Sequence, residues 1–355
     1  MKKYDNLYDE ICAFRNLLLA SKKAKKGKRN ILYVQKFEIE LEKELHQLKK
    51  ELTEKTYKPG KYKEFYIYEP KKRMISAAPY RDRIVHHALC NIIEPIYEKS
   101  FIQDSYANRK RKGTHAALNR FNEFAQENVY VLKCDIKKYF PSIDHEILKQ
   151  VVREKIECKG TLELIDKIID NSNPQEQIIT YFYNDDLFTP HERKKGIPIG
   201  NLTSQFLANV FLDKLDNFIE SKLGINKYIR YVDDFVIFGN NKQELMSCLI
   251  KIEAYLDELR LILNKNKTKI YSIKKGAKFL GFKMFSNFRL VQRSNIIRAK
   301  SRFKKIEYQI ASFSIEKAKV LSCVNGWLGH VKNANSRKLI NKMCILYPLT
   351  FESLN

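Results

Sequence analysis

The stretch YIRYVDDFVIFG, residues 228–239, places two adjacent aspartates, Asp233 and Asp234, between two runs of β-branched and aromatic residues. Such runs are typical of buried strands, so we expect the aspartates at or near the tip of a β-hairpin. A turn without further role is the simpler interpretation of an Asp-Asp pair. Two carboxylates at the end of a buried strand repel each other and resist desolvation, however, and a bound Mg²⁺ ion would compensate them.

A third carboxylate follows another strand-like segment. VYVLKCD, residues 129–135, has the composition of a buried strand that ends at Asp135. An aspartate at one strand end indicates little by itself. Two such sites in one chain fit a single device, in which adjacent strands hold three acids around two metal ions. Two metal ions roughly 3.5–4 Å apart activate an attacking hydroxyl and stabilise a leaving oxygen in an in-line displacement at phosphorus.

Length and composition bound the class of protein. The chain has 355 residues, 44% of them hydrophobic, which allows two or three lobes with an ordinary core. No apolar run reaches the roughly 18 residues that span a bilayer, and the first residues do not read as a secretory signal. The seven cysteines are scattered and odd in number, which favours reduced thiols. We therefore expect a cytoplasmic protein without a membrane partner.

The charge predicts a polyanionic partner. Lys and Arg number 66 against 41 Asp and Glu, a net charge of +25. A lysine-rich but otherwise ordinary surface is the alternative. The charges cluster, however, because residues 293–342 hold twelve basic residues and two acids, and residues 21–29 read SKKAKKGKR. The apolar residues beside these clusters look like core-facing stripes, so the clusters favour nucleic acid over a membrane surface.

The order of elements predicts an α+β fold with a mostly antiparallel sheet. Ser142 or Asp144 is available to cap the helix that follows Asp135. The predicted elements, in chain order, are helices over 1–56, strand-like residues at 56–83, a helix over 84–98, the strand at 129–135, helices over 141–155 and 161–170, a short hairpin at 178–190, a helix over 203–220, the hairpin of the opening stretch, a helix over 241–260, short strands within 263–285, and helices over 293–345.

Three motifs together identify a family resemblance. Asp135 with an aromatic residue five positions later, YVDD at 231–234 and FLGF at 279–282 resemble the palm motifs of reverse transcriptases in order and spacing. The resemblance spans roughly residues 60–340 and implies a right-hand polymerase with fingers, a palm and a helical thumb. The implied parts are an N-terminal helical extension at 1–56, fingers at 57–128, a palm at 129–285 with a finger insertion at about 150–195, and a thumb at 286–355.

The same resemblance implies roles for palm residues. Phe140 falls where the family places its sugar gate, a bulky ring that clashes with a 2′-hydroxyl and so favours deoxynucleotides. A core phenylalanine is the alternative for this position. The three aspartates are the implied catalytic carboxylates, and the bound ions are two Mg²⁺, with Mn²⁺ as an alternative. The implied metal ligands are Asp135, Ile136, Asp233 and Asp234.

Basic residues of the implied fingers resemble those that clamp a nucleotide triphosphate. Arg73 is the best match, with Lys71 and Lys72 beside it, and Arg81 is a weaker one. Lys267 lies near where some polymerases keep a general acid for pyrophosphate. Surface solvation is the alternative for each residue. The implied nucleotide-binding residues are Lys72, Arg73, Phe140, Ile199, Gly200, Gln205 and Lys267.

Other residues resemble the family's contacts to nucleic acid. Gly281, in FLGF, resembles the primer grip, where a glycine allows close approach of the backbone. For Trp327 and His330, in the implied thumb, core packing is the favoured interpretation. His86 and His87 are expected to be structural. The implied nucleic-acid contacts are Arg83, Gly281, Arg298, Arg302 and Lys304.

One motif departs from the usual family pattern. Most reverse transcriptases carry QGxxxSP, whereas residues 199–205 here read IGNLTSQ, with Ile199 for Gln and Gln205 for Pro. This pattern resembles diversity-generating retroelement reverse transcriptases and implies error-prone copying opposite template adenines. In the family the missing glutamine hydrogen-bonds the incoming nucleotide, a contact of about 0.5–1.5 kcal/mol, or up to about 3 when charge-assisted. Gly200 is expected to keep the turn close to the template base. Drift in an ordinary bacterial reverse transcriptase is the alternative.

Three hypotheses remain. The first is an RNA-directed DNA polymerase of the diversity-generating type, bacterial or phage-encoded. Its implied partners are a template RNA, the cDNA paired to it as a heteroduplex, dNTPs and a small basic helical accessory protein. The second is a group II intron-like or phage-defence reverse transcriptase of ordinary fidelity. The third is a non-catalytic RNA-binding protein on the same scaffold.

Overall fold

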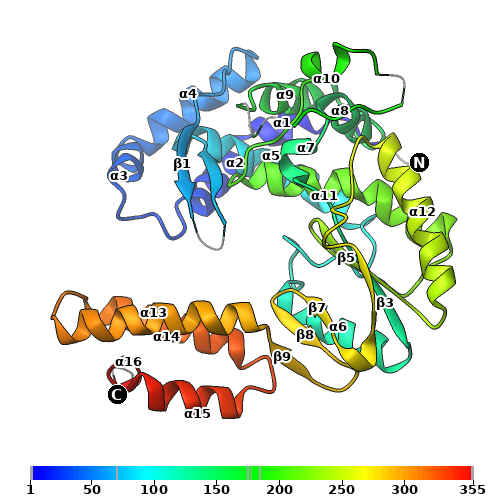
Figure 1. Cartoon of the computed structure of the whole chain (residues 1–355). Helices are drawn as coiled ribbons and strands as arrows, with labels where there is room; N and C mark the ends of the chain where they lie inside the picture. The colour runs from blue at the N-terminus through cyan, green and yellow to red at the C-terminus, as the bar shows by residue number, and fades with distance from the viewer. Residues whose placement is uncertain (1–2, 69–70, 174–175, 177, 184, 353–355) are drawn as a thin grey trace.

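The computed structural model describes residues 3–68, 71–173, 176, 178–183 and 185–352, and Figure 1 shows how its elements are arranged. Helices combined with antiparallel sheets confirm the predicted α+β fold. The elements are α1 Tyr8–Cys12, α2 Phe14–Ala24, α3 Leu32–Ile39, α4 Leu41–Thr53, β1 Lys63–Ile67, β2 Arg73–Ala77, α5 Tyr80–Glu98, α6 Thr114–Gln126, β3 Tyr130–Asp135, α7 Tyr139–Ser142, α8 His145–Arg153, α9 Lys159–Asp170, α10 Thr189–Glu192, α11 Leu202–Asn217, η1 Phe218–Lys222, β4 Tyr228–Tyr231, β5 Asp234–Gly239, α12 Lys242–Glu258, β6 Lys269–Ser272, η2 Ile273–Lys275, β7 Ala277–Phe279, β8 Phe282–Met284, β9 Arg289–Val291, α13 Arg293–Ala311, α14 Lys317–Val331, α15 Arg337–Leu346 and α16 Pro348–Glu352.

The central sheet has the strand order β4-β5-β3-β6, and its neighbouring strands are all antiparallel. Successive residues of β3 and β5 point to opposite faces of this sheet. Leu132 and Ile237 join the core that includes α11, while Val131 and Val236 join the core that includes α6. Because helices cover both faces, these strands are nearly continuous runs of apolar residues.

Helices α5 and α11 form the centre of the upper lobe in Figure 1. α11 is buried on almost every side, and the large side chains of Phe211 and Leu215 are fully enclosed. α5 packs against both α11 and α2, and it contributes Ile84 and Leu89 to the same core. The N-terminal helix α2 therefore packs, through α5, against the helix α11 whose core includes residues of the central sheet.

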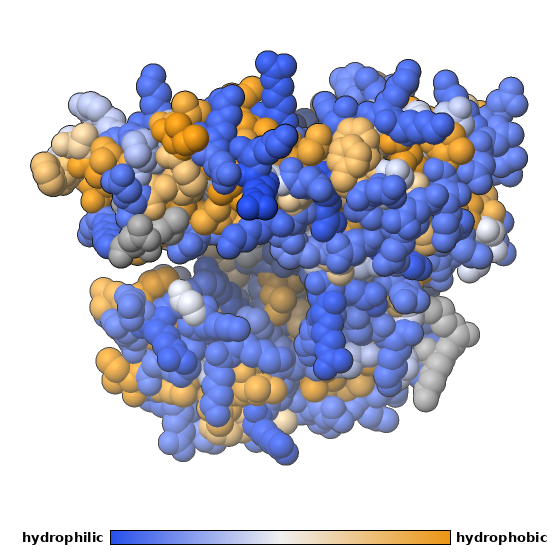
Figure 2. All heavy atoms as spheres, turned by 90° about the horizontal axis from the view of Figure 1, so that it is seen from below, coloured by the Kyte–Doolittle hydropathy of each residue, from blue (hydrophilic) through white to orange (hydrophobic). Residues whose placement is uncertain are grey.

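The C-terminal helices form a second lobe with its own core. Phe303 of α13 packs against Trp327 of α14 at a ring-centroid distance of 5.2 Å, and Phe351 of α16 contacts both rings. In Figure 1 the β7-β8-β9 sheet joins this lobe to the central sheet, and α13 faces the β1–β2 hairpin. Seen from below in Figure 2, a hollow enters between two masses whose surface is mostly hydrophilic.

One predicted element is wrong and several boundaries shift. The described residues of 178–190 form no hairpin. Asp186 instead accepts hydrogen bonds from the backbone of Phe188 and Thr189, and α10 begins at Thr189. This Asp-headed turn and the following Thr-Pro pair start a helix instead of a strand. Asp144 is confirmed as the N-cap of α8, which begins at His145 because α7 takes up the preceding Pro-Ser.

Two further predictions concern membranes and cysteines. Among the described residues, no helix combines the length and apolarity that crossing a bilayer requires. The seven cysteines are all free thiols, and four of them are buried. The residue boundaries proposed for the fingers, palm and thumb stay predictions.

Candidate active site

The three predicted carboxylates meet at one end of the central sheet. The β4–β5 hairpin turns at Val232, which has a φ of 56°, and Asp233. Strand pairing sets Asp135 of β3 directly opposite Asp234 of β5. The backbone N–H of Ile136 donates to the carbonyl of Asp233 at 3.1 Å, which holds the end of β3 against the turn. Residues almost a hundred positions apart in the chain are thereby fixed side by side.

Two lysines partly neutralise this acid cluster. The Lys267 ammonium donates to both carboxylate oxygens of Asp135 at 2.6 Å each, and the Asn264 amide reaches one of them at 3.2 Å. Lys133, two residues before Asp135 on β3, lies 3.1 Å from Oδ1 of Asp234. The Lys133 and Asn264 contacts could not be predicted from the sequence, because both depend on contacts between distant segments.

The electrostatics of the cluster favour a cation. Burial, with the neighbouring carboxylates of Asp234 and Asp135, raises the pKa of Asp233 to about 6. Burial also raises the pKa of Asp234, although Lys133 opposes the change. These shifts mean that the folded chain holds more negative charge here than it readily tolerates.

The donor set fits a hard divalent ion. No three His, Cys, Asp or Glu side chains in the described parts of the chain already surround a common point. Asp135, Asp233 and Asp234 nevertheless offer oxygen ligands only, which Mg²⁺ prefers. For an ion to bind Asp135, the Lys267 ammonium has to leave its carboxylate. The assignment of metal ligands stays a prediction.

A cavity of about 700 Å³ lies beside Asp233 and contains most of the predicted nucleotide-binding residues. The β1–β2 hairpin supplies one wall and the segment after β3 the other. Tyr66, which carries the Lys72 ammonium 4.6 Å above its ring, was not predicted. The residues that line the cavity are Tyr66, Lys71, Lys72, Arg73, Met74, Lys138, Tyr139, Phe140, Pro141, Glu176, Ile199 and Asp233.

The IGNLTSQ segment is pinned to the β1–β2 hairpin. The N–H of Ser76 donates to the carbonyl of Ile199 at 3.1 Å, and the Asn201 side chain bonds both Ser76 and Ala78. Gly200 has a φ of +113°, and a Cβ there would lie 2.9 Å from the Ile75 side chain. Glycine is therefore required at position 200 for its backbone angle and for space. The carbonyl and amide partners of Asn201 were not foreseen from the sequence.

Several predicted residues lie outside this cavity. Arg83 donates to the carbonyl of Ala78 at 2.8 Å, and Arg81 pairs with Glu51 at 2.5 Å. Gln205 is half-buried on α11. His86 is buried within α5, in keeping with its expected structural role.

The predicted nucleic-acid contacts other than Arg83 lie at the start of α13 and along its exposed face. Gly281 has a φ of +89°, and its carbonyl accepts a hydrogen bond from Asn295 of α13 at 3.0 Å. Trp327 packs into the core of the C-terminal lobe, and His330 lies 4.5 Å from Phe282 between ring centroids. The exposed basic side chains on α13 include Arg298, Arg302 and Lys304.

Comparison of the sequence with known proteins shows which family it matches. Residues 57–284, well over half of the chain, match the family model described as reverse transcriptase (RNA-dependent DNA polymerase). Protein YkfC of Escherichia coli K12 is 25% identical over 281 residues, covering 68% of this chain and 71% of that protein. Group II intron-encoded protein LtrA of Lactococcus lactis is 24% identical over 331 residues, covering 74% of this chain.

Other relatives are matched over part of their length. Retron Ec83 reverse transcriptase of Escherichia coli is 29% identical over 196 residues, covering 52% of this chain and 55% of that protein. The chain spans 52% of LtrA and 30% of a yeast protein described as putative COX1/OXI3 intron 2 protein. The matched residues include the β1–β2 hairpin, the three carboxylates and FLGF. This chain belongs to the reverse transcriptase family.

Proposed function

We propose that this chain copies a template RNA into DNA by two-metal nucleotidyl transfer. The observation that carries the proposal is the strand register that sets Asp135 opposite Asp234, with Asp233 in the adjoining turn. When bound, two Mg²⁺ ions would activate the primer 3′-hydroxyl and stabilise the leaving pyrophosphate. Asp135, Asp233 and the backbone of Ile136 would hold them.

The chain's own side chains then divide the remaining work. Lys133 stays paired with Asp234 and keeps the end of β5 in place. Lys267, released from Asp135, would donate a proton to the leaving pyrophosphate. Arg73 and Lys72 of the cavity wall orient the triphosphate through charge-assisted contacts. The ring of Phe140, on the opposite wall, excludes a 2′-hydroxyl.

The RNA–DNA heteroduplex would lie between the β1–β2 hairpin and α13. The exposed basic face of α13 supports this location, because backbone phosphates and A-like shape are what such a surface can read. Binding should therefore weaken steeply with salt, with log K falling by about 0.7–0.9 for each phosphate neutralised per unit of log salt.

We further propose the error-prone, diversity-generating type, with a small basic helical accessory protein as partner. The support is IGNLTSQ, in which Ile199 lines the nucleotide cavity without a hydrogen-bonding side chain. A second candidate is a reverse transcriptase of ordinary fidelity, favoured by relatives named for group II introns and retrons.

Sequencing of the cDNA made on a defined RNA template with Mg²⁺ and dNTPs tests both proposals. Substitutions confined to template adenines support the diversity-generating type, and a flat spectrum supports ordinary fidelity. If no cDNA forms with or without the accessory protein, the polymerase proposal itself is wrong and a non-catalytic RNA-binding role gains.

A further inference from the structure

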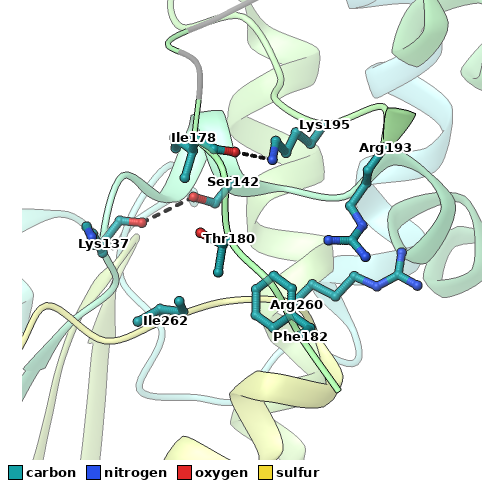
Figure 3. Close-up of a pocket in the computed structure, with 9 residues that line it drawn as sticks. All are labelled: Lys137, Ser142, Ile178, Thr180, Phe182, Arg193, Lys195, Arg260 and Ile262. Carbon is teal, nitrogen blue, oxygen red and sulfur yellow. Dashed lines mark hydrogen bonds between the residues drawn. The ribbon is translucent and has the colours of Figure 1, made fainter. Parts of the chain in front are cut away.

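A second cavity adjoins the nucleotide cavity and has a different lining (Figure 3). Residues 138–141 line the nucleotide cavity, while Lys137 and Ser142, which flank them, line this one. The N–H of Lys137 donates to the carbonyl of Ile262 at 2.8 Å, which fixes the floor. The other lining residues are Ile178, Thr180, Phe182, Arg193, Lys195 and Arg260.

Positive charge converges on this cavity from separate segments. Four of its lining side chains are cationic, namely Lys137, Arg193, Lys195 and Arg260, and Figure 3 shows Arg193 and Arg260 lying close together at one side. Their carboxylate partners in the described residues are Asp144, which contacts Arg260 at 2.7 Å and Arg193 at 3.4 Å, and Asp185, which contacts Arg193. Two carboxylates against four cations leave a surplus of two positive charges.

Arg193 is the residue that needs a ligand. Its side chain is only 5% exposed, and its Nη1 atom is buried without a hydrogen-bond partner. Asp144 does not fill the gap, because its Oδ2 lies 3.4 Å from Nε of Arg193 and makes its hydrogen bond with Arg260. A buried guanidinium nitrogen without an acceptor is costly, and an anion in the cavity would satisfy it.

The size of the cavity limits what can enter. Its free volume of about 20 Å³ is little more than one water molecule needs, so an oxygen of a phosphoryl group can reach in from the mouth, whereas a nucleoside cannot enter. Guanidinium and ammonium groups in this arrangement match a phosphoryl group, with Ser142 and Thr180 as hydroxyl neighbours. A terminal phosphoryl group presents three oxygens without a nucleotide on either side, so it fits this confined space better than an internal phosphate does.

We propose that this cavity is a binding site for a terminal phosphoryl group, distinct from the nucleotide cavity. Free pyrophosphate and the 5′-phosphate of a strand present the same chemistry. None of its lining residues is a proposed metal ligand. Phosphate binding at this site can therefore be tested separately from the proposed polymerase activity.

Calorimetric titration of the full chain with pyrophosphate, in EDTA so that no divalent ion takes part, tests the proposal. An Arg73→Gln background suppresses binding in the nucleotide cavity. Adding Arg260→Gln removes a lining cation whose side chain is 37% exposed, so the fold should survive. Lys251→Gln, an exposed lysine on α12, the helix that ends just before Arg260, is the matched control.

We expect pyrophosphate to bind in the Arg73→Gln background and Arg260→Gln to weaken it about tenfold to a hundredfold, as loss of a charge-assisted contact does. Lys251→Gln should leave the affinity unchanged. If Arg260→Gln unfolds the chain, Lys137→Gln, another exposed lining cation, should give a loss of the same sign. Absence of binding, or equal affinity in the folded lining variants and the control, would overturn the proposal.

A second titration separates the two sources. A short oligonucleotide with a 5′-phosphate is compared with the same strand bearing a 5′-hydroxyl. Preference for the phosphorylated strand, lost in Arg260→Gln, supports the site and assigns it to a strand end. Binding of pyrophosphate with no such preference supports the site and assigns it to the free anion.

Discussion

Acids and bases lie in a row near the turn of the β4–β5 hairpin, and the two ends of this row are built for opposite purposes. At the inner end, Arg230 of β4 and Asp216 of α11 are completely buried and joined by contacts of 2.7 and 2.6 Å, and Tyr228 and Asn209 complete their hydrogen bonds. At the outer end, three residues further along the chain, burial and two neighbouring carboxylates raise the pKa of Asp233.

The difference teaches how one hairpin separates stability from chemistry. The charges of Arg230 and Asp216 neutralise each other through fixed hydrogen bonds, so the side chains at this end have a single arrangement. The lysines at the acid cluster are replaceable partners, since Lys267 is 43% exposed and can leave Asp135. A site that must accept ions and nucleotides needs such incomplete neutralisation. The fully buried Arg230–Asp216 pair keeps the hairpin rigid while the site binds them.

The largest effect is expected from breaking the buried pair. Asp216→Asn leaves the Arg230 guanidinium buried without its counter-charge, which should lower the free energy of unfolding by about 3–5 kcal/mol. Urea unfolding measures this loss. In the control Asp257→Asn, an exposed position on α12, the free energy of unfolding should change by less than about 0.5 kcal/mol. A loss below about 1 kcal/mol for Asp216→Asn would remove the contrast between the two ends.

Lys267 tests the opposite end. Lys267→Met should slow primer extension about a hundredfold, because a proton donor is lost. The free energy of unfolding should change by less than in Asp216→Asn, because the Lys267 side chain is 43% exposed although that of Asp135 is only 6% exposed. Lys265→Met, an exposed neighbour in the same loop, is the control. A large drop in stability with an unchanged rate would show that Lys267 is structural, like Arg230.

The pH dependence of stability should come from buried structural groups. Burial, with His87 and Arg83 nearby, lowers the pKa of His86 to about 3, and burial with Lys23 and Lys28 lowers that of His87 to about 4. The unfolded chain therefore takes up these protons first, and stability present above about pH 6.5 is lost as the pH falls toward 4. Each histidine contributes at most about 1.4 kcal/mol per pH unit.

His86→Gln should flatten this acid limb when urea midpoints are measured between pH 7.5 and 4.5. The exposed His191→Gln, at the end of α10, should leave the slope as it is. An unchanged slope in His86→Gln would mean that other groups control acid unfolding.

The smallest effect is expected at the nucleotide cavity. Ile199→Gln restores a hydrogen-bonding side chain, worth about 0.5–1.5 kcal/mol, so misincorporation at template adenines should fall by about threefold to tenfold. Sequencing of the cDNA measures it, with the exposed Ile250→Gln on α12 as control. Equal error rates in the two variants would contradict the role given to Ile199.

The strand-end positions of the acidic residues could be predicted from the sequence, but the ion pairs around them could not. Apolar runs around Asp135 and Asp233 indicated strands that end in acids, and the pairing of β3 with β5 bears out their convergence. Local pattern could not reveal that Lys133 would neutralise Asp234, because that contact depends on strand register. The same limit hid Arg230, which looks like any strand residue until α11 brings Asp216 to it.

Loops set the other limit. Alternating residues in 178–190 indicated a hairpin, but an Asp-headed turn and the pairing of Asp144 with Lys195 gave a loop that closes the second cavity instead. The four cations of that cavity come from the segments that follow β3, α10 and α12. No single segment carries enough of them to be recognised.

Primer extension by Asp233→Asn tests the central claim most directly. The full chain is given a defined RNA template, a DNA primer, dNTPs and Mg²⁺, and the free energy of unfolding is measured on the same preparation. We predict that the wild-type chain extends the primer, and that Asp233→Asn loses at least about a hundredfold in rate while remaining as stable as the wild type or more so. Extension by Asp233→Asn at the wild-type rate would contradict the account.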